Sequence, residues 1–171
     1  MNKDNPAIRV LVVDDSSFIR NSLSKMLSAE YALETAEDGE EALGKYQQFK
    51  PDIMILDLNM PKMGGMEVIN FLRKRVGDMD VYILVLTADE STYQKTMALS
   101  IGANDYLVKP FVREELIARV GVAKRQVLLL RDLRNALAEI EREMATVLSL
   151  QKKLLPEVKP ELPGVNLQDL H

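Results

Sequence analysis

The segment Ile8–Leu23, IRVLVVDDSSFIRNSL, decides the fold. Its mainly apolar, β-branched run from Ile8 to Val13 predicts a strand buried on both faces, which is typical of a parallel sheet. The run ends in two carboxylates, Asp14 and Asp15. Burying an ionised carboxylate costs several kcal/mol unless something compensates it. The sequence therefore predicts a group at the end of this strand that offsets the two negative charges.

The composition narrows the class of protein. The chain has 171 residues, no cysteine and a formal net charge of −4, so we expect one domain with some appended structure and no disulfide or thiolate metal site. The slight acidic excess is not the positive charge that binding to nucleic acid or an anionic membrane requires. No segment approaches the roughly 18 uncharged apolar residues of a membrane span. We expect no nucleic-acid partner, no membrane and a cytoplasmic location.

Apolar strand-like runs alternate with amphipathic helical segments along most of the chain. This alternation is typical of an α/β fold in which helices cover both faces of a doubly wound parallel sheet. The predicted strands are Arg9–Val13, Ala32–Ala36, Ile53–Leu56, Tyr82–Leu86 and Asp105–Leu107. The predicted helices are Ser17–Ser28, Glu40–Gln48, Gly65–Arg75 and Ser91–Ser100, with Ser16 and Ser91 as N-caps and Gly102 as a left-handed C-cap.

Polar side chains follow four of the five predicted strands: Asp14 and Asp15, then Asp57, Thr87 and Lys109. Taken singly, each is explained as well by a solvated turn or a cap. The carboxyl ends of parallel strands meet at one edge of a sheet, where ligands bind, so together they predict one site. Three carboxylates about 5 Å apart would repel by roughly 3 kcal/mol per pair at an effective dielectric of about 20. The site therefore needs a divalent cation.

The chemistry of these side chains selects the ion and a reaction. Oxygen ligands without His or Cys favour a hard ion, and a site with open positions suits Mg²⁺. Phosphoryl transfer onto a carboxylate needs mainly positioning and neutralisation of charge. We expect Asp57 to accept the phosphoryl group, Lys109 and Mg²⁺ to neutralise it, and Thr87 to bind one of its oxygens. The pair at Asp14 and Asp15 is then tolerable because it holds the metal.

Four stretches, LVVDDSSFIR, PDIMILDLNMPKMGGMEVI, ILVLTA and GANDYLVKPF, resemble the receiver domain of two-component response regulators. The resemblance extends from about Ile8 to Lys124. It implies a flavodoxin-like sheet with strand order 2-1-3-4-5. It also implies that Asp57 accepts a phosphoryl group from a phosphohistidine of a sensor histidine kinase or phosphotransfer protein. The chain would then be a regulatory phosphoacceptor and not an enzyme, and the single histidine, His171, is not the donor.

The same resemblance implies roles for individual residues. The Mg²⁺ ligands would be Asp14, Asp15, Asp57 and the backbone carbonyl of Asn59. Lys109 would pair with the phosphoryl group, Thr87 and Tyr106 would form the switch, and the Lys109–Pro110 bond would be cis. Without the resemblance, Tyr106 would be a half-buried strand aromatic. One departure is Gly64, where many family members carry Asp, and we expect it to affect the loop and not the chemistry.

A long helix is predicted from Val112 to Leu155, because this stretch has no proline, one glycine and apolar residues at helical spacing. From Leu130 the spacing is that of a coiled coil, with one polar position at Gln151 and an apolar seam at Leu130, Leu133, Leu137, Ile140, Met144, Val147 and Leu154. The alternative, packing of this stripe on the receiver's own sheet, would have to cover about 40 Å of helix beyond the domain. We therefore expect a parallel homodimer, with residues 1–124 as the receiver domain and 125–155 as the coiled coil.

The end of the chain resembles a second family. The stretch VLSLQKKLLPEVKPELPGVNLQ is similar to the segment that precedes PP2C-type serine/threonine phosphatase domains in bacterial stress-response regulators. This resemblance implies that residues 156–171 begin an output domain that the chain does not contain. The alternative is a freestanding signalling adaptor whose helix binds a partner protein.

Two other functions are disfavoured. A Mg²⁺-dependent phosphohydrolase acting through an aspartyl phosphate would need a general acid two residues after its nucleophile, and Asn59 cannot protonate a leaving group. A DNA-binding regulator is disfavoured because the long helix mixes both charge signs.

Overall fold

The computed structural model describes residues 7–88 and 92–154. Its five strands are β1 (Arg9–Val13), β2 (Ala32–Ala36), β3 (Ile53–Asp57), β4 (Tyr82–Thr87) and β5 (Asp105–Val108). All four neighbouring pairs are parallel, in the order β2-β1-β3-β4-β5. The predicted fold and strand order are confirmed. β3, β4 and β5 each extend one residue beyond the predicted end, so that Asp57 and Thr87 are the last residues of their strands.

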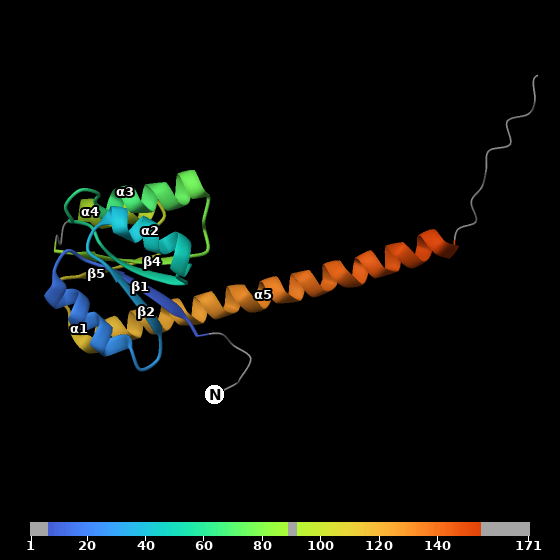
Figure 1. Cartoon of the computed structure of the whole chain (residues 1–171), viewed down its shortest axis with the longest axis horizontal. Coiled ribbons are helices and arrows are strands. Elements are labelled where there is room, and N and C mark those ends of the chain that lie inside the picture. The colour runs from blue at the N-terminus through green and yellow to red at the C-terminus, as the bar shows by residue number, and fades with distance from the viewer. Residues whose placement is uncertain (1–6, 89–91, 155–171) are drawn as a thin grey trace, which may run out of the picture. The chain divides into compact units, whose positions relative to one another are not determined.

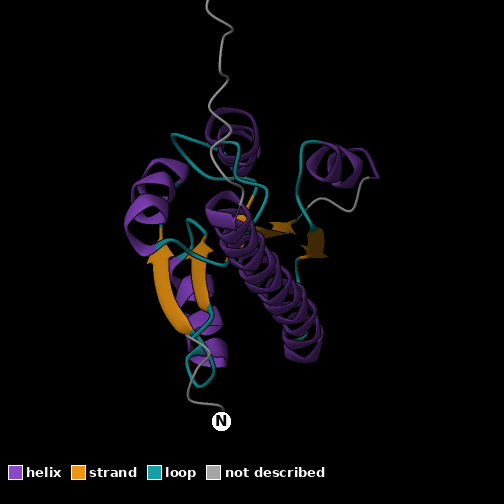
Figure 2. Ribbon diagram, turned by 90° about the vertical axis from the view of Figure 1, so that its right-hand side faces the viewer, coloured by secondary structure: helices purple, strands orange, loops and turns teal. Residues whose placement is uncertain are grey.

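Helices cover both faces of the sheet. They are α1 (Ser17–Leu27), α2 (Gly39–Phe49), α3 (Gly65–Asn70), the π-helix η1 (Phe71–Val76), α4 (Thr92–Ser100) and α5 (Arg113–Leu154). α1 and the first part of α5 cover one face, and α2, α3 and α4 cover the other (Figure 1). Figure 2 places the orange strands between purple helices. Residues of β1, β3 and β4 alternate between these two apolar cores, which explains why these strands are apolar almost throughout.

One helix differs from its prediction. The segment Gly65–Arg75 was predicted as one regular helix, but the chain changes to π-helical turns at Phe71. The wider turns accompany the burial of Arg73, whose side chain lies inward of the helix. Its guanidinium donates to the carbonyl oxygens of Gly102 (2.9 Å), Asp78 (2.6 Å) and Val81 (2.8 Å). These bonds satisfy a buried charge that would otherwise be costly. The apolar spacing that predicted a regular helix carries no information about them.

The helix termini follow their sequence signals. Ser16 caps α1, accepting the N–H of Ile19 at 3.5 Å. Gly102 has a φ of 111°, which is the positive value expected after α4. The predicted cap at Ser91 lies outside the described residues. Within those residues, no helix is long and apolar enough to cross a membrane.

The contacts divide the chain into two compact units, Met1–Arg131 and Asp132–His171. The first unit contains the sheet and α1 to α4 with the beginning of α5. The second unit contains the rest of α5, residues 132–154, which we call the stalk. Each unit is described by itself.

Candidate phosphoacceptor and metal site

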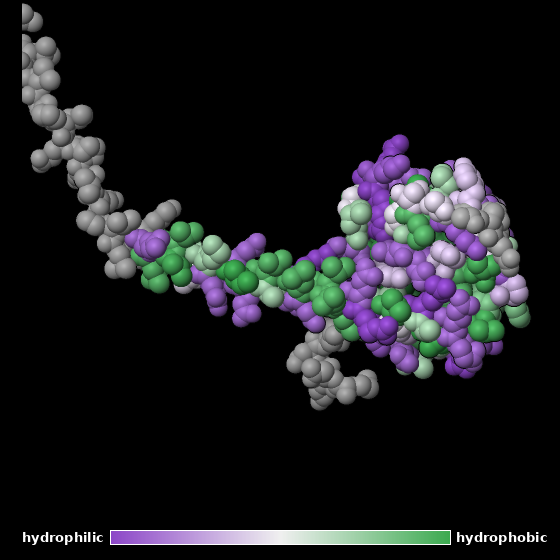
Figure 3. All heavy atoms as spheres, turned by 180° about the vertical axis from the view of Figure 1, so that it is seen from behind, coloured by the Kyte–Doolittle hydropathy of each residue, from purple (hydrophilic) through white to green (hydrophobic). Residues whose placement is uncertain are grey.

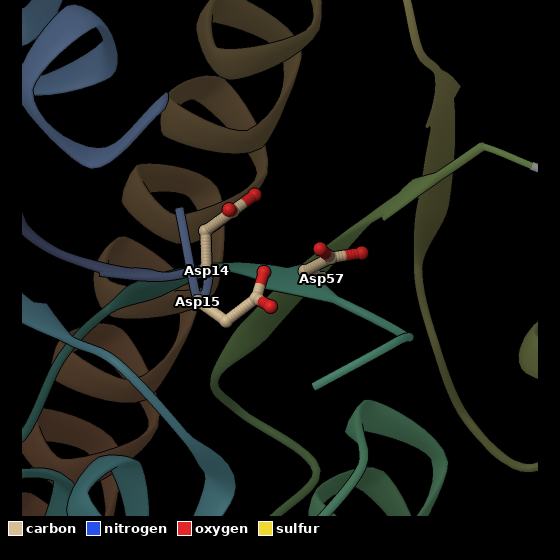
Figure 4. Close-up of side chains that lie close together, drawn as sticks. All are labelled: Asp14, Asp15 and Asp57. Carbon is tan, nitrogen blue, oxygen red and sulfur yellow. The ribbon is translucent and has the colours of Figure 1, made fainter. Parts of the chain in front are cut away.

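Three carboxylates meet at the ends of β1 and β3. Asp14 and Asp15 follow β1, and Asp57 ends β3 (Figure 4). Ligand oxygens of the three side chains lie within 4.8 Å of one another. Asp14 is fully buried, Asp57 is 5% exposed, and Asp15 is open to solvent. The parallel pairing of β1 with β3 brings these side chains together, as expected from the strand ends.

Lys109 joins this group from the end of β5. Its ammonium lies 2.6 Å from Asp14 Oδ2 and 2.8 Å from Asp57 Oδ2. Its backbone N–H donates to the Thr87 carbonyl oxygen at 2.7 Å, and the Lys109–Pro110 peptide bond is cis. Burial alone would lower the pKa of the Lys109 ammonium, but its hydrogen bonds to Asp14 and Asp57 outweigh burial and hold that pKa above its usual value. Lys109 is therefore a fixed positive charge beside Asp57.

Burial also acts on the phosphoacceptor. It raises the pKa of the Asp57 carboxyl above its usual value, and the neighbouring Lys109 ammonium opposes this shift without cancelling it. Three carboxylates and one ammonium leave two negative charges at the site if all are ionised. A divalent cation would offset this charge, and a donor set made only of oxygen atoms fits Mg²⁺.

Backbone groups orient two of the carboxylates. Asp14 Oδ1 accepts the N–H of Ser16 at 2.9 Å, and Asp57 Oδ1 accepts the N–H of Asn59 at 3.3 Å. Arg20, a site residue that no sequence motif predicted, donates from Nη1 to the carbonyl oxygens of Asp14 (2.7 Å) and Asp15 (3.0 Å). Its position in the first turns of α1, shortly after Asp14 and Asp15, is the sequence feature that could have predicted its role. Arg20 therefore holds the backbone that presents the two acids.

The two predicted switch residues lie on neighbouring strands. Thr87 is 1% exposed at the end of β4. In the β4–β5 pairing Thr87 is opposite Val108, and Tyr106 is opposite Val85. Tyr106 is half-buried, and its ring lies 5.3 Å from the Lys95 ammonium and 6.0 Å from the Arg119 guanidinium carbon. Their joint action as a switch stays a prediction.

The predicted seam residues lie along the later part of α5. Leu130 is half-buried in the first unit. The five seam residues whose side chains are described in the stalk are 52–61% exposed: Leu133, Leu137, Ile140, Met144 and Val147. In Figure 3, green apolar side chains run along this part of the helix between purple polar ones. The side chain of Leu154 lies outside the described residues.

A parallel five-stranded sheet with acids at the carboxyl ends of its first and third strands and a lysine at that of its fifth defines a receiver-type protein. The response regulator receiver domain profile matches residues 10–121. The chain therefore belongs to the response regulator receiver domain family of two-component systems.

Relatives of known sequence agree with this family. The chain is 46% identical over 120 residues to the response regulator MprA of Mycolicibacterium vanbaalenii, a match that covers 70% of this chain and 51% of the relative. It is 46% identical over 121 residues to MprA of Mycobacterium tuberculosis, covering 70% and 52% of the two chains. The chain thus spans about half the length of the curated relatives it matches.

Solved structures agree as well. The chemotaxis protein CheY4 of Vibrio cholerae matches with a TM-score of 0.65 and 39% identity, over 69% of this chain and 99% of CheY4. A chain of the CheX–CheY–BeF3–Mg²⁺ complex from Borrelia burgdorferi matches with a TM-score of 0.62 and 32% identity, over 66% of this chain and 86% of that one.

Proposed function

We propose that this chain is a phosphoacceptor in which Asp57 takes a phosphoryl group from the phosphohistidine of a sensor histidine kinase or phosphotransfer protein. The observation that carries the proposal is the placement of the Asp57 carboxylate beside Lys109 and within reach of Asp14 and Asp15. A carboxylate oxygen of Asp57 attacks phosphorus, the phosphorus–nitrogen bond breaks, and the imidazole leaves with its electron pair. Like other receiver domains, the chain is regulatory, and self-phosphorylation and autodephosphorylation are its own chemistry.

The surrounding residues stabilise the transferring group. Lys109 already contacts Asp57 Oδ2, so its ammonium is in place to pair with a phosphoryl oxygen. Thr87, at the end of the adjacent strand, is in our proposal the hydroxyl donor to a second oxygen. The electrostatic contribution of such fixed charges needs no reorganisation during the reaction.

We propose Mg²⁺ as the cofactor, held by Asp14, Asp15, Asp57 and the backbone carbonyl of Asn59. When bound, the ion supplies positive charge to the phosphoryl oxygens. The support is the cluster of three carboxylates with its surplus negative charge, together with the family's acidic pocket and the Mg²⁺ named in the CheX–CheY complex that contains a similar chain.

A phosphodonor protein needs a surface close to Asp57. Phe18, near the start of α1 and four residues after Asp14, is 81% exposed. It lines an apolar groove of about 410 Å³ between α1 and the segment Lys109–Phe111. An exposed aromatic beside such a groove is typical of a protein-binding surface, so we place the donor protein here.

We further propose that the stalk pairs two chains and transmits the phosphorylation signal to an output domain, with a PP2C-type phosphatase as the candidate from the sequence. The exposed seam supports this, because apolar stripes at heptad spacing are normally buried by a second helix. A freestanding adaptor whose stalk binds another protein is the alternative. We propose that the protein acts in the cytoplasm.

The test of the proposed function uses phosphoramidate, a small donor whose phosphorus–nitrogen bond resembles that of phosphohistidine. Intact-mass measurement of the chain with donor and Mg²⁺ should give one added phosphoryl group. The Asp57→Asn variant should remain unmodified. A variant that is modified as fully as the parent would overturn the assignment.

A further inference from the structure

The loop between β3 and α3, residues 58–64, begins immediately after Asp57. Backbone hydrogen bonds next to the site fix the two ends of this loop. The Leu58 N–H donates to the Leu86 carbonyl oxygen at 3.2 Å, and the Gly65 N–H donates to the Leu58 carbonyl oxygen at 3.0 Å. A Cβ at Gly65 would lie 2.3 Å from the Asp57 carbonyl oxygen, so only glycine allows this close approach.

The middle of the loop is held by a separate set of contacts with the start of α2. The Lys62 ammonium pairs with the Asp38 carboxylate. Next to this pair, the Gly39 N–H donates to the Met63 carbonyl oxygen at 3.2 Å, and a Cβ at Gly39 would lie 2.6 Å from that oxygen. We call these two contacts, Lys62–Asp38 and Met63–Gly39, the latch.

The Asp38 end of the latch is rigid. Its side chain is 3% exposed. One of its oxygens caps α2 by accepting the Glu41 N–H at 2.9 Å, and the other faces Lys62. Because both oxygens are engaged, the carboxylate cannot turn away from the loop without leaving the helix cap.

The Lys62 end of the latch holds an unfavourable backbone conformation. Lys62 has a φ of 61°, in the left-handed region that side chains with a Cβ rarely adopt. Lys50, with a φ of 49°, shares this conformation, but it is the C-cap of α2, where left-handed residues are common. Lys62 ends no helix. A left-handed residue of this kind persists only where surrounding contacts determine it, and such residues cluster at functional sites.

We infer that Asp38 and Lys62 are positioning residues of the metal site, which hold the loop so that the Asn59 carbonyl is presented to Mg²⁺. The inference rests on the proposed function and names two further residues for it. Asn59 lies between the fixed end of the loop at Asp57 and the latch at Lys62, and its N–H already donates to Asp57 Oδ1. A carbonyl ligand moves only with its backbone, so the position of the loop decides its geometry.

The experiment measures Mg²⁺ binding by calorimetry on the full chain. Lys62→Met removes the ammonium, and Asp38→Asn keeps a helix cap but removes the charge. Both should weaken Mg²⁺ binding by about tenfold, the low end of the loss typical of residues that orient metal ligands. The double variant, Lys62→Met with Asp38→Asn, should bind Mg²⁺ as weakly as the single variants do. Lys62→Arg, which keeps the positive charge, should bind Mg²⁺ like the parent. The matched control is Lys50→Met, which removes the same charge from another exposed left-handed lysine and should bind Mg²⁺ like the parent.

A second readout separates positioning from structure. The rate of phosphorylation by phosphoramidate should fall in Lys62→Met at low Mg²⁺ and recover at saturating Mg²⁺, and thermal unfolding in chelator should barely change because Lys62 is 57% exposed. Unchanged Mg²⁺ affinity in Lys62→Met, or equal losses in Lys50→Met, would overturn the inference. If the parent itself binds no Mg²⁺, the proposed metal site fails and the latch role with it.

Discussion

Replacing Leu137 by Asp in the stalk should dissociate the chain into monomers. Leu137 lies in the middle of the seam and is 52% exposed in the single chain. Two of its seam neighbours, Leu133 and Ile140, are 54% and 52% exposed. In a parallel dimer the two copies of this position face each other across the seam, so the substitution places two carboxylates in an apolar interface.

The exposed fractions set the size of the effect. Full burial of such a side chain contributes about 1.5–3 kcal/mol. About half of each seam side chain is exposed in the single chain, so its burial on pairing contributes about 0.8–1.5 kcal/mol. Ten such side chains in a dimer contribute about 8–15 kcal/mol, against about 4–15 kcal/mol for the freedom lost on association. The dimer should therefore depend on concentration. Losing two leucines removes about 2–3 kcal/mol, or about 30- to 150-fold in the dissociation constant, before the cost of the charges.

Sedimentation equilibrium across a range of concentrations measures this constant. The matched control is Asn135→Asp. It adds the same charge at an exposed position on the side of the helix opposite the seam. The control should dimerise like the parent, and a chain ending at Lys124 should be monomeric. If Leu137→Asp and the truncated chain remain as dimeric as the parent, the seam is not the interface, and the face formed by α4 and β5 becomes the leading candidate.

Three further predictions concern the receiver unit. Asp52→Asn removes the carboxylate that lies 2.7 Å from the Arg131 guanidinium, and it should lower the free energy of unfolding in urea by about 1–2 kcal/mol. Arg20→Met removes the hydrogen bonds to the carbonyls that follow β1 and should weaken Mg²⁺ binding by about tenfold in calorimetry. Burial opposes ionisation of Asp78, but hydrogen bonds from Tyr46 and two backbone N–H groups hold its pKa below the usual value of 3.8. The stability lost in Asp78→Asn should therefore be complete at neutral pH and should disappear as the pH falls through that lowered pKa, measured by unfolding at several pH values.

Sequence reasoning reached the site because parallel strands impose its geometry. Once β1, β3, β4 and β5 run parallel in one sheet, the residues at their carboxyl ends must lie along one edge, and Asp14, Asp57 and Lys109 meet there. The strand limits were short by one residue at Asp57 because a polar residue was taken to end the strand. The backbone ladder instead continues through it, opposite Leu86.

The features that sequence reasoning missed depend on contacts between distant segments. The π-helical turns at Phe71 accompany hydrogen bonds from Arg73 to residues before β4 and β5, which no local periodicity reports. The latch joins Lys62 to Asp38, 24 positions apart in the chain. The left-handed backbone of Lys62 carries no local signal, since glycine or asparagine would be the expected residue there.

The central claim is that Asp57 is the phosphoacceptor and that it needs the metal. After treatment with phosphoramidate, borohydride reduces an aspartyl phosphate to homoserine, so peptide mass spectrometry locates the modified residue. The account predicts homoserine at position 57 alone, formed in Mg²⁺ and absent when the metal is chelated. Homoserine at another aspartate, or equal labelling of Asp57 in chelator, would contradict it.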